Sequence, residues 1–114
     1  MEPVSATLIL KALDSLSLRA TVTAQNIANA NSPNYRPMRV SFEEALRSAA
    51  PQGLDAIRAV QPQILPSSDE EGNGALRLDL ELATASSTAG RYGTLVEILN
   101  RQLQMNALAL SGVR

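Results

Sequence analysis

The placement of proline constrains this chain more than any other feature of its sequence. Five of the six prolines fall between residues 31 and 77, together with three of the six glycines. Proline inside a helix removes a hydrogen bond and clashes with the preceding turn, so long helices are possible only in the flanks. The sequence therefore divides into an N-terminal helix over 1–31, an irregular central segment over 32–77 and a C-terminal helix over 78–114.

Both flanks carry apolar residues at the alternating three- and four-residue spacing of a coiled-coil seam. The N-terminal seam comprises Ile9, Leu13, Leu16, Ala20, Thr23 and Ile27. The C-terminal seam comprises Leu82, Ala85, Ala89, Tyr92, Val96, Leu99, Leu103, Asn106 and Leu110. A lone amphipathic helix leaves its stripe in water, so each seam needs a partner. The sequence predicts an all-α fold in which the flanking helices pair as a coiled-coil hairpin.

A second apolar stripe lies beside each predicted seam. These residues are Leu8, Leu10, Ala12, Leu18 and Val22 in the first flank and Leu95, Ile98, Gln102, Met105 and Ala109 in the second. A two-helix hairpin cannot cover both stripes of each helix, so we expect the second stripes to contact other chains. Acidic and basic residues balance within each flank, which permits copies to pack closely side by side.

The central segment has weaker patterns. Apolar and polar residues alternate over 38–42, which indicates a short extended piece. Ser41 and Glu44 have the spacing of a capping box, which predicts a short helix after them, and 54–60 fits another turn or two. No periodicity is visible over 61–74, so we expect a loop there.

The composition speaks against catalysis. The chain has no histidine and no cysteine, so the usual general base, metal ligand and best nucleophile are missing. Asp69, Glu70 and Glu71 stand in a Ser/Gly-rich stretch without apolar neighbours, which is typical of solvated charge. The net charge of −1 provides no electrostatic footprint for nucleic acid or an anionic membrane. We expect no enzyme activity, no cofactor and no metal.

The first helix ends in the segment Ala28-Asn29-Ala30-Asn31-Ser32-Pro33-Asn34-Tyr35. Asn31 suits a left-handed helix cap, and Pro33 cannot continue the helix. Pro33 also suits the second position of a type II turn, whose third position requires the positive φ that Asn34 tolerates. Ordinary helix-end chemistry by itself accounts for these residues.

This segment also resembles the N-terminal motif of the bacterial flagellar axial proteins, which reads approximately A-N-A-N-T-P-G-Y. The two departures, Ser32 for threonine and Asn34 for glycine, keep the physical roles of those positions. Within this group, the residues that follow the turn (36–46) and the stretch 91–103 are similar to the FlgB family of proximal rod proteins.

The resemblance implies a structural subunit of the flagellar basal body, whose copies pack side by side into the tubular proximal rod that transmits torque. It implies export by the type III export apparatus without a cleaved signal peptide, and a location in the periplasmic rod. The implied partners are copies of the chain, other rod subunits, the ring-to-rod adaptor and the membrane-supramembrane ring protein. No nucleic acid and no direct membrane insertion are expected.

We expect the assembly interface to involve residues of both seams and the polar residues of the helix end. These are Ile9, Leu13, Leu16, Ala20, Gln25, Asn26, Ile27, Asn29, Asn31, Tyr92, Val96, Leu99, Leu103 and Leu110, with Ser32, Pro33, Asn34 and Tyr35 forming the motif turn. Gln25, Asn26 and Asn29 are either solvated polar residues or hydrogen-bonding groups that set helix register, and the resemblance favours register. Gly90 and Gly93 suggest close approach of another helix.

Two other functions agree with parts of the sequence. A cytoplasmic coiled-coil adaptor would pair its seam with one helical partner and form a discrete soluble dimer. An enzyme subunit would have to act through carboxylates such as Glu70 and Glu71, for example on peptidoglycan.

Overall fold

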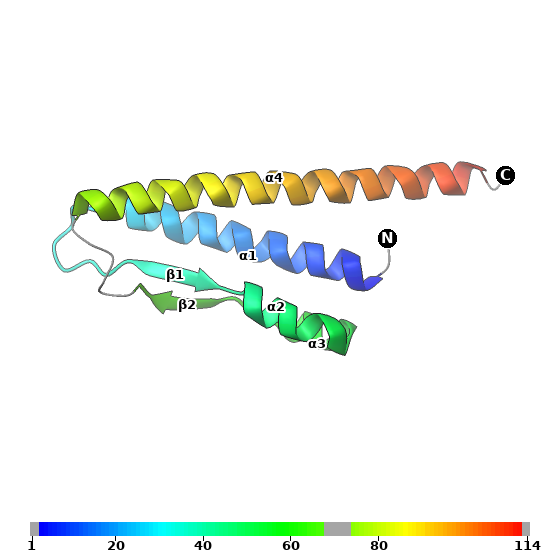
Figure 1. Ribbon diagram of the computed structural model, residues 1–114, viewed down its shortest axis with the longest axis horizontal. Helices are drawn as coiled ribbons and strands as arrows, with labels where there is room; N and C mark the ends of the chain where they lie inside the picture. Colours follow the sequence, from blue (N-terminus) through cyan, green and yellow to red (C-terminus); the bar gives the residue numbers. More distant parts are fainter. Residues whose placement is uncertain (1–2, 68–73, 113–114) are drawn as a thin grey trace.

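Two long antiparallel helices run along the molecule, and the central segment folds back along one of them (Figure 1). The computed structural model describes residues 3–67 and 74–112. The long helices are α1 (Pro3–Ala28) and α4 (Gly74–Gly112), and the molecule measures 64 × 26 × 16 Å. The C-terminal end of α4 projects beyond the start of α1 (Figure 1). The predicted fold, with two paired terminal helices and an irregular centre, is confirmed.

The helix boundaries differ from the predicted ones by a few residues. Helix α1 ends at Ala28, before the asparagine-rich turn, and α4 begins at Gly74. The earlier start of α4 has a simple reason, because residues 75–78 read Ala-Leu-Arg-Leu and all four are strong helix formers. The division of the chain into three parts stays a prediction.

The extended piece predicted over 38–42 is confirmed as strand β1 (Met38–Ser41). It pairs with an antiparallel partner, β2 (Gln63–Pro66), in a register that places Val40 opposite Ile64. The prediction of a loop over 61–74 is therefore wrong for residues 63–66, which form β2. The four residues of β2 read Gln-Ile-Leu-Pro and are all exposed, so the strand has no alternating apolar pattern to reveal it. Its one proline, Pro66, is tolerated because β2 is an edge strand.

Three short helices complete the central segment: α2 (Glu43–Ala49), the 3₁₀ helix η1 (Ala50–Gln52) and α3 (Leu54–Ala59). The predicted capping box is wrong, since Phe42 occupies the N-cap position of α2 and no side chain caps the helix. Phe42 is almost completely buried, at 2% exposure, so its packing sets where the helix begins. Ser41 instead ends β1.

The hydrophobic core lies between α1 and the central segment. Its buried residues are Leu16, Val22, Val40, Phe42, Leu46, Ala49 and Ile57, and the α1 residues Val4, Leu8, Ala12 and Leu18 pack against them. The second stripe of α1 is therefore covered by the chain's own centre, which corrects the expectation that it contacts other chains. Leu10 is the exception and is half exposed, at 51%. The sequence could not show this, because the covering elements are short and lack a strong periodicity.

Replacing Ile57 tests where the core lies. Ile57 is completely buried, so Ile57→Ala should lower the free energy of unfolding by about 2–5 kcal/mol, through lost contacts and a residual cavity. Urea unfolding followed by circular dichroism measures this loss. Ile64 is 47% exposed, so Ile64→Ala should change stability by only about 0.5 kcal/mol. Equal losses in the two variants would contradict a core centred on Ile57.

Candidate functional site

The candidate site is the interface between α1 and α4 together with the turn that ends α1. On the α1 side, the predicted seam residues differ in exposure: Leu13, Leu16 and Thr23 are buried, Ile9 and Ile27 are half-buried, and Ala20 is exposed. Leu16 also belongs to the hydrophobic core. The predicted α1 seam is thus largely used within the chain.

On the α4 side, the buried residues are polar. Among the described side chains of α4, only Glu81 and Thr88 are buried. The half-buried residues are Arg77, Leu78, Ala85, Leu95, Val96, Leu99 and Gln102. The predicted seam shares Ala85, Val96 and Leu99 with this face, whereas Leu82 and Tyr92 are 51% and 41% exposed. Apolar spacing cannot identify the polar residues Glu81 and Thr88 as buried. The seam that it predicts therefore lies partly on the side of α4 that faces away from α1.

Asn26 joins three parts of the molecule through its side-chain amide. The side chain is buried, and its Nδ2 donates to the carbonyl of Met38 at 2.8 Å and to Oε2 of Glu81 at 3.1 Å. Its Oδ1 accepts from the Met38 N–H at 3.1 Å and from the Tyr35 hydroxyl at 2.9 Å. Both donors and both lone pairs of the amide are thereby used. Asn26 connects α1 to the turn, to β1 and to α4.

The pairing of Asn26 with Met38 completes the open edge of β1. The Ser67 N–H donates to the Pro37 carbonyl at 2.9 Å, so the carbonyl of Pro37 points toward the β2 side. Because main-chain groups alternate in direction along an antiparallel strand, those of Met38 and Val40 point away from β2. Asn26 takes both groups of Met38, and Arg19 Nη2 donates to the Val40 carbonyl at 2.6 Å. Two side chains of α1 thus act in place of a third strand.

The helix-end turn forms as predicted at its centre. The Tyr35 N–H donates to the Ser32 carbonyl at 3.3 Å, and Asn34 has a φ of +67°. With the φ of Pro33 restricted by its ring, a positive φ at the third position is the type II arrangement. Ser32 and Tyr35 are half-buried, whereas Pro33 and Asn34 are exposed. Tyr35 is thereby directed toward Asn26.

The predicted left-handed cap at Asn31 is wrong, because Asn34 is the one non-glycine residue with positive φ among the described residues. The helix instead ends in two tighter turns, in which Ala30 N–H donates to the Ile27 carbonyl and Ser32 N–H to the Asn29 carbonyl. These bonds satisfy the carbonyls of Ile27 and Asn29 at the end of the helix.

The other polar residues of the helix end make local contacts. Asn29 Nδ2 donates to the Gln25 carbonyl at 2.9 Å, and Asn29 Oδ1 accepts from the Ser32 hydroxyl at 3.2 Å. The side chains of Gln25 and Asn31 are exposed. From α4, Arg77 Nη2 reaches the Ala30 carbonyl at 3.2 Å. Of the three residues considered for register, Asn26 is therefore the one that reaches across to α4 within the chain.

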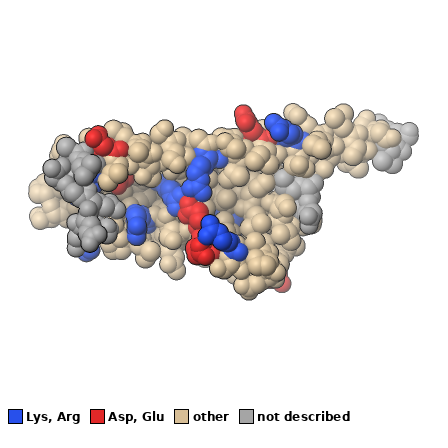
Figure 2. All heavy atoms as spheres, viewed as in Figure 1, with Lys and Arg blue, Asp and Glu red and all other residues tan. Residues whose placement is uncertain are grey.

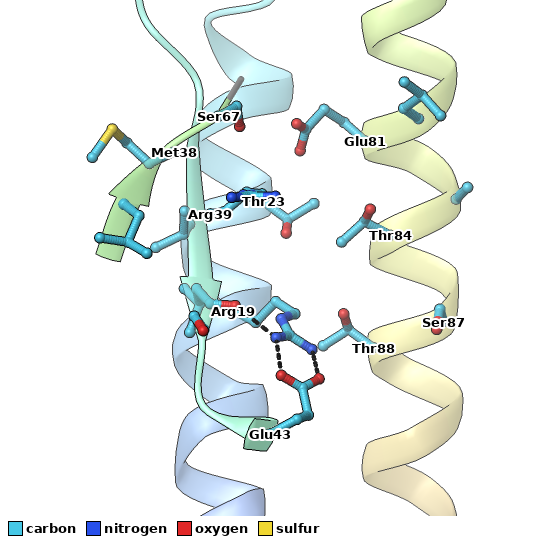
Figure 3. A pocket seen from close by; sticks show the side chains of 16 residues that line it. Arg19, Thr23, Met38, Arg39, Glu43, Ser67, Glu81, Thr84, Ser87 and Thr88 are labelled. Atoms are coloured by element: carbon cyan, nitrogen blue, oxygen red, sulfur yellow. Dashed lines mark hydrogen bonds and ion pairs between the residues drawn. The ribbon is translucent and has the colours of Figure 1, made fainter. Parts of the chain in front are cut away.

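A charged cluster, which sequence reasoning missed, connects α1, α2 and α4. Arg19 holds Glu43 with two bonds of 2.6 and 2.8 Å (Figure 3). Arg91 contacts Glu43 Oε2 at 2.9 Å. The Arg19 guanidinium also lies over the Phe42 ring, 4.7 Å from its centre. The hydrogen bond from Arg19 is the main cause that lowers the pKa of Glu43 from 4.5 to about 2, and Arg91 adds to it against partial desolvation. In Figure 2 acidic and basic side chains meet in the middle of the visible face.

A groove of about 660 Å³ with both polar and apolar walls lies between β1 and α4, and Arg19 and Glu43 of this cluster form part of it. Thr23, Thr84 and Thr88 point into the space between α1 and α4 (Figure 3). Ser67, whose buried hydroxyl has no hydrogen-bond partner among the described residues, also lines the groove. The groove shows that α4 does not pack tightly against β1.

The C-terminal end of α4 is uncovered. Every described side chain from Leu103 to Gly112 is exposed, including Leu103 at 56%, Leu108 at 72% and Leu110 at 74%. Gly90 and Gly93 have open space where a side chain would begin, so the close approach of a helix to them does not occur within this chain.

Metal ligands and membrane-spanning helices were also sought among the described residues. Within residues 3–67 and 74–112, no group of three or more potential ligands is arranged to hold a metal ion. The same residues include no helix with the length and apolarity required to cross a membrane. The acidic run Asp69–Glu71 lies outside the described residues.

Parts of the chain are similar to known flagellar proteins, although no protein-family model matches it. The flagellar basal body rod protein FlgB of Borrelia hermsii is 39% identical over 62 residues, which cover 54% of this chain and 43% of that relative. The protein of the same name from Borreliella burgdorferi is 49% identical over 37 residues, which cover 32% of this chain and 27% of that relative. The matched segments span less than half the length of either relative. Over these segments the chain is FlgB-like.

The turn can be tested at Asn34. Its φ of +67° is unfavourable for a β-branched residue, so Asn34→Val should lower the free energy of unfolding by about 1–2 kcal/mol. Asn34→Gly should leave stability nearly unchanged, because glycine adopts positive φ freely. Urea unfolding of the two variants and the parent chain makes the comparison. Equal stability of the valine and glycine variants would contradict the left-handed conformation at this residue.

The charged cluster predicts an acid-dependent loss of stability. Because the pKa of Glu43 is lowered to about 2 in the folded chain, its contribution is complete above the unfolded value of 4.5 and is lost as the pH falls through 2. Glu43 is 37% exposed, so solvent screening reduces the expected loss to about 1 kcal/mol. Unfolding measured between pH 6 and pH 2 should show this loss in the parent chain and not in Glu43→Gln. An identical pH dependence in both would contradict the role of Glu43.

Proposed function

We propose that this chain is a structural subunit of the flagellar rod, and that its copies pack side by side through their long helices. Three observations support the proposal: the similarity to two FlgB proteins, the motif turn after α1, and the antiparallel pair of long helices. The function is mechanical, and we assign the chain no catalytic role. The similarity is partial, so the function of the whole relatives is transferred here as a proposal.

The exposed end of α4 is the observation that carries the proposal. Residues 102–112 contain no charged residue, and the leucines at 103, 108 and 110 are all more than half exposed. Monomeric proteins rarely leave a contiguous apolar surface of this kind in water. Leu103 and Leu110 follow the half-buried Val96 at intervals of seven residues, so they continue its side of α4 toward the C-terminal end, where a neighbouring subunit can extend the same packing.

The candidate interface residues then divide by burial: five are half-buried (Ile9, Ile27, Asn29, Val96 and Leu99), and the others form two groups. Leu13, Leu16 and Asn26 are buried within the chain, so we propose that they serve assembly indirectly, by holding the hairpin together. The exposed residues are available for contact with neighbouring subunits: Ala20, Gln25, Asn31, Tyr92, Leu103 and Leu110. Gly90 and Gly93 belong with this second group, since open space surrounds them.

The finer assignment follows the resemblance. We propose a place in the proximal rod, where side-to-side contacts carry torque, and a location in the periplasm after type III export without a cleaved signal peptide. The proposed neighbours are other rod subunits, the ring-to-rod adaptor and the membrane-supramembrane ring protein.

Charges introduced on the exposed end of α4 test the proposal. Leu103→Asp with Leu110→Asp should leave folding intact, because both side chains are more than half exposed in the single chain. The pair should abolish assembly, since each carboxylate would be buried without a partner between subunits, at a cost of several kcal/mol. Motility and basal-body morphology are measured in cells of the source bacterium that lack their own copy. Circular dichroism of the purified variant checks the fold.

A matched control adds the same charge elsewhere on α4. Asn100 and Gln104 are exposed polar residues, so Asn100→Asp with Gln104→Asp should preserve assembly. Normal rods in the leucine variant would contradict the proposed interface. A discrete soluble dimer at micromolar concentration, disrupted by the leucine pair, would indicate the coiled-coil adaptor instead.

A further inference from the structure

The hydrophobic core is built almost without α4. Its seven buried members come from α1, β1, α2, α3 and the residue between β1 and α2. Among the described side chains of α4, Leu95 alone packs against this cluster, and it is only partly buried. Residues 3–67 thus contain the core of the molecule, and α4 lies on the outside of it.

Polar contacts supply the specific attachments of α4. Glu81 accepts from Asn26 at 3.1 Å, Arg91 contacts Glu43 at 2.9 Å, and Arg77 reaches the Ala30 carbonyl at 3.2 Å. Arg91 and Glu43 are 48% and 37% exposed, so water screens their attraction. The groove beside Thr84 and Thr88 further reduces the contact of α4 with β1.

Separating α4 costs less than unfolding the core. The apolar residues of α4 that become exposed (Leu78, Ala85, Leu95, Val96 and Leu99) are only half-buried in the closed arrangement. Hydrophobic burial is the main favourable term in folding, and it concentrates in the part of the chain without α4. When α4 separates, water hydrates the polar side chains of Glu81, Thr88 and Thr23, which are buried in the closed arrangement. Asn26 keeps its two bonds to Met38 and its bond to Tyr35, so the edge of β1 stays satisfied.

We propose that α4 undocks as a unit from a folded body formed by residues 3–67. The Glu43–Arg91 and Asn26–Glu81 contacts are the latch that holds α4 in the closed arrangement. Undocking leaves the core, the two-stranded sheet and the motif turn intact. The proposal does not depend on the rod function, since it concerns how the single chain is held together.

Native-state amide hydrogen exchange of the full chain tests this undocking, at a concentration where sedimentation shows a monomer. Amides over 81–99 should exchange through one shared opening about tenfold or more faster than amides over 13–22 in the middle of α1. Arg91→Ala and Glu81→Ala should each speed exchange in α4 by about two- to fivefold and leave α1 unchanged.

Arg47→Ala is the matched control, because Arg47 forms an exposed pair with Glu44 within α2. It should alter exchange in neither long helix. Equal exchange rates in α1 and α4, or equal acceleration of both helices by Arg91→Ala, would overturn the proposal, since both results mean that α4 opens only when the whole chain unfolds.

Discussion

The buried amide of Asn26 holds the turn, the sheet edge and α4 in place relative to α1. An unpaired N–H and carbonyl on the inner edge of β1 would each cost free energy, and Asn26 satisfies both groups of Met38 at once. The same amide accepts from Tyr35, which fixes the turn, and donates to Glu81, which aligns α4. A single side chain therefore couples the helix end, the sheet edge and the hairpin register, and aspartate or leucine could not replace it, because neither offers two donors with two acceptor sites.

The long helices and the turn were predictable from local rules. Proline exclusion and apolar spacing predicted two terminal helices, and the preference of Asn34 for positive φ predicted the centre of the turn. The rest depends on contacts between distant residues: β2 pairs with β1 across 22 or more residues, and Glu43 meets Arg19 and Arg91 from two helices. Apolar spacing could not predict which face of α4 meets α1, because the buried residues of that face, Glu81 and Thr88, are polar.

The two long helices differ in what holds them. Helix α1 supplies Leu16 and Val22 to the core, whereas the only buried described side chains of α4, those of Glu81 and Thr88, are polar, and this helix ends in an uncovered apolar stretch. This asymmetry suits a subunit whose folded body forms first and whose last helix completes its packing against neighbours. The similarity to FlgB proteins supports the proposal that this arrangement serves in the flagellar rod.

The proposed assembly, in which hairpins pack side by side through the free end of α4, can be seen in a density map of the basal body from the source bacterium, at a resolution that separates helices. We expect copies of the antiparallel α1–α4 pair in the wall of the rod, with residues 103–112 enclosed between subunits. A rod without this hairpin, or one in which residues 103–112 face solvent, would rule out this assembly.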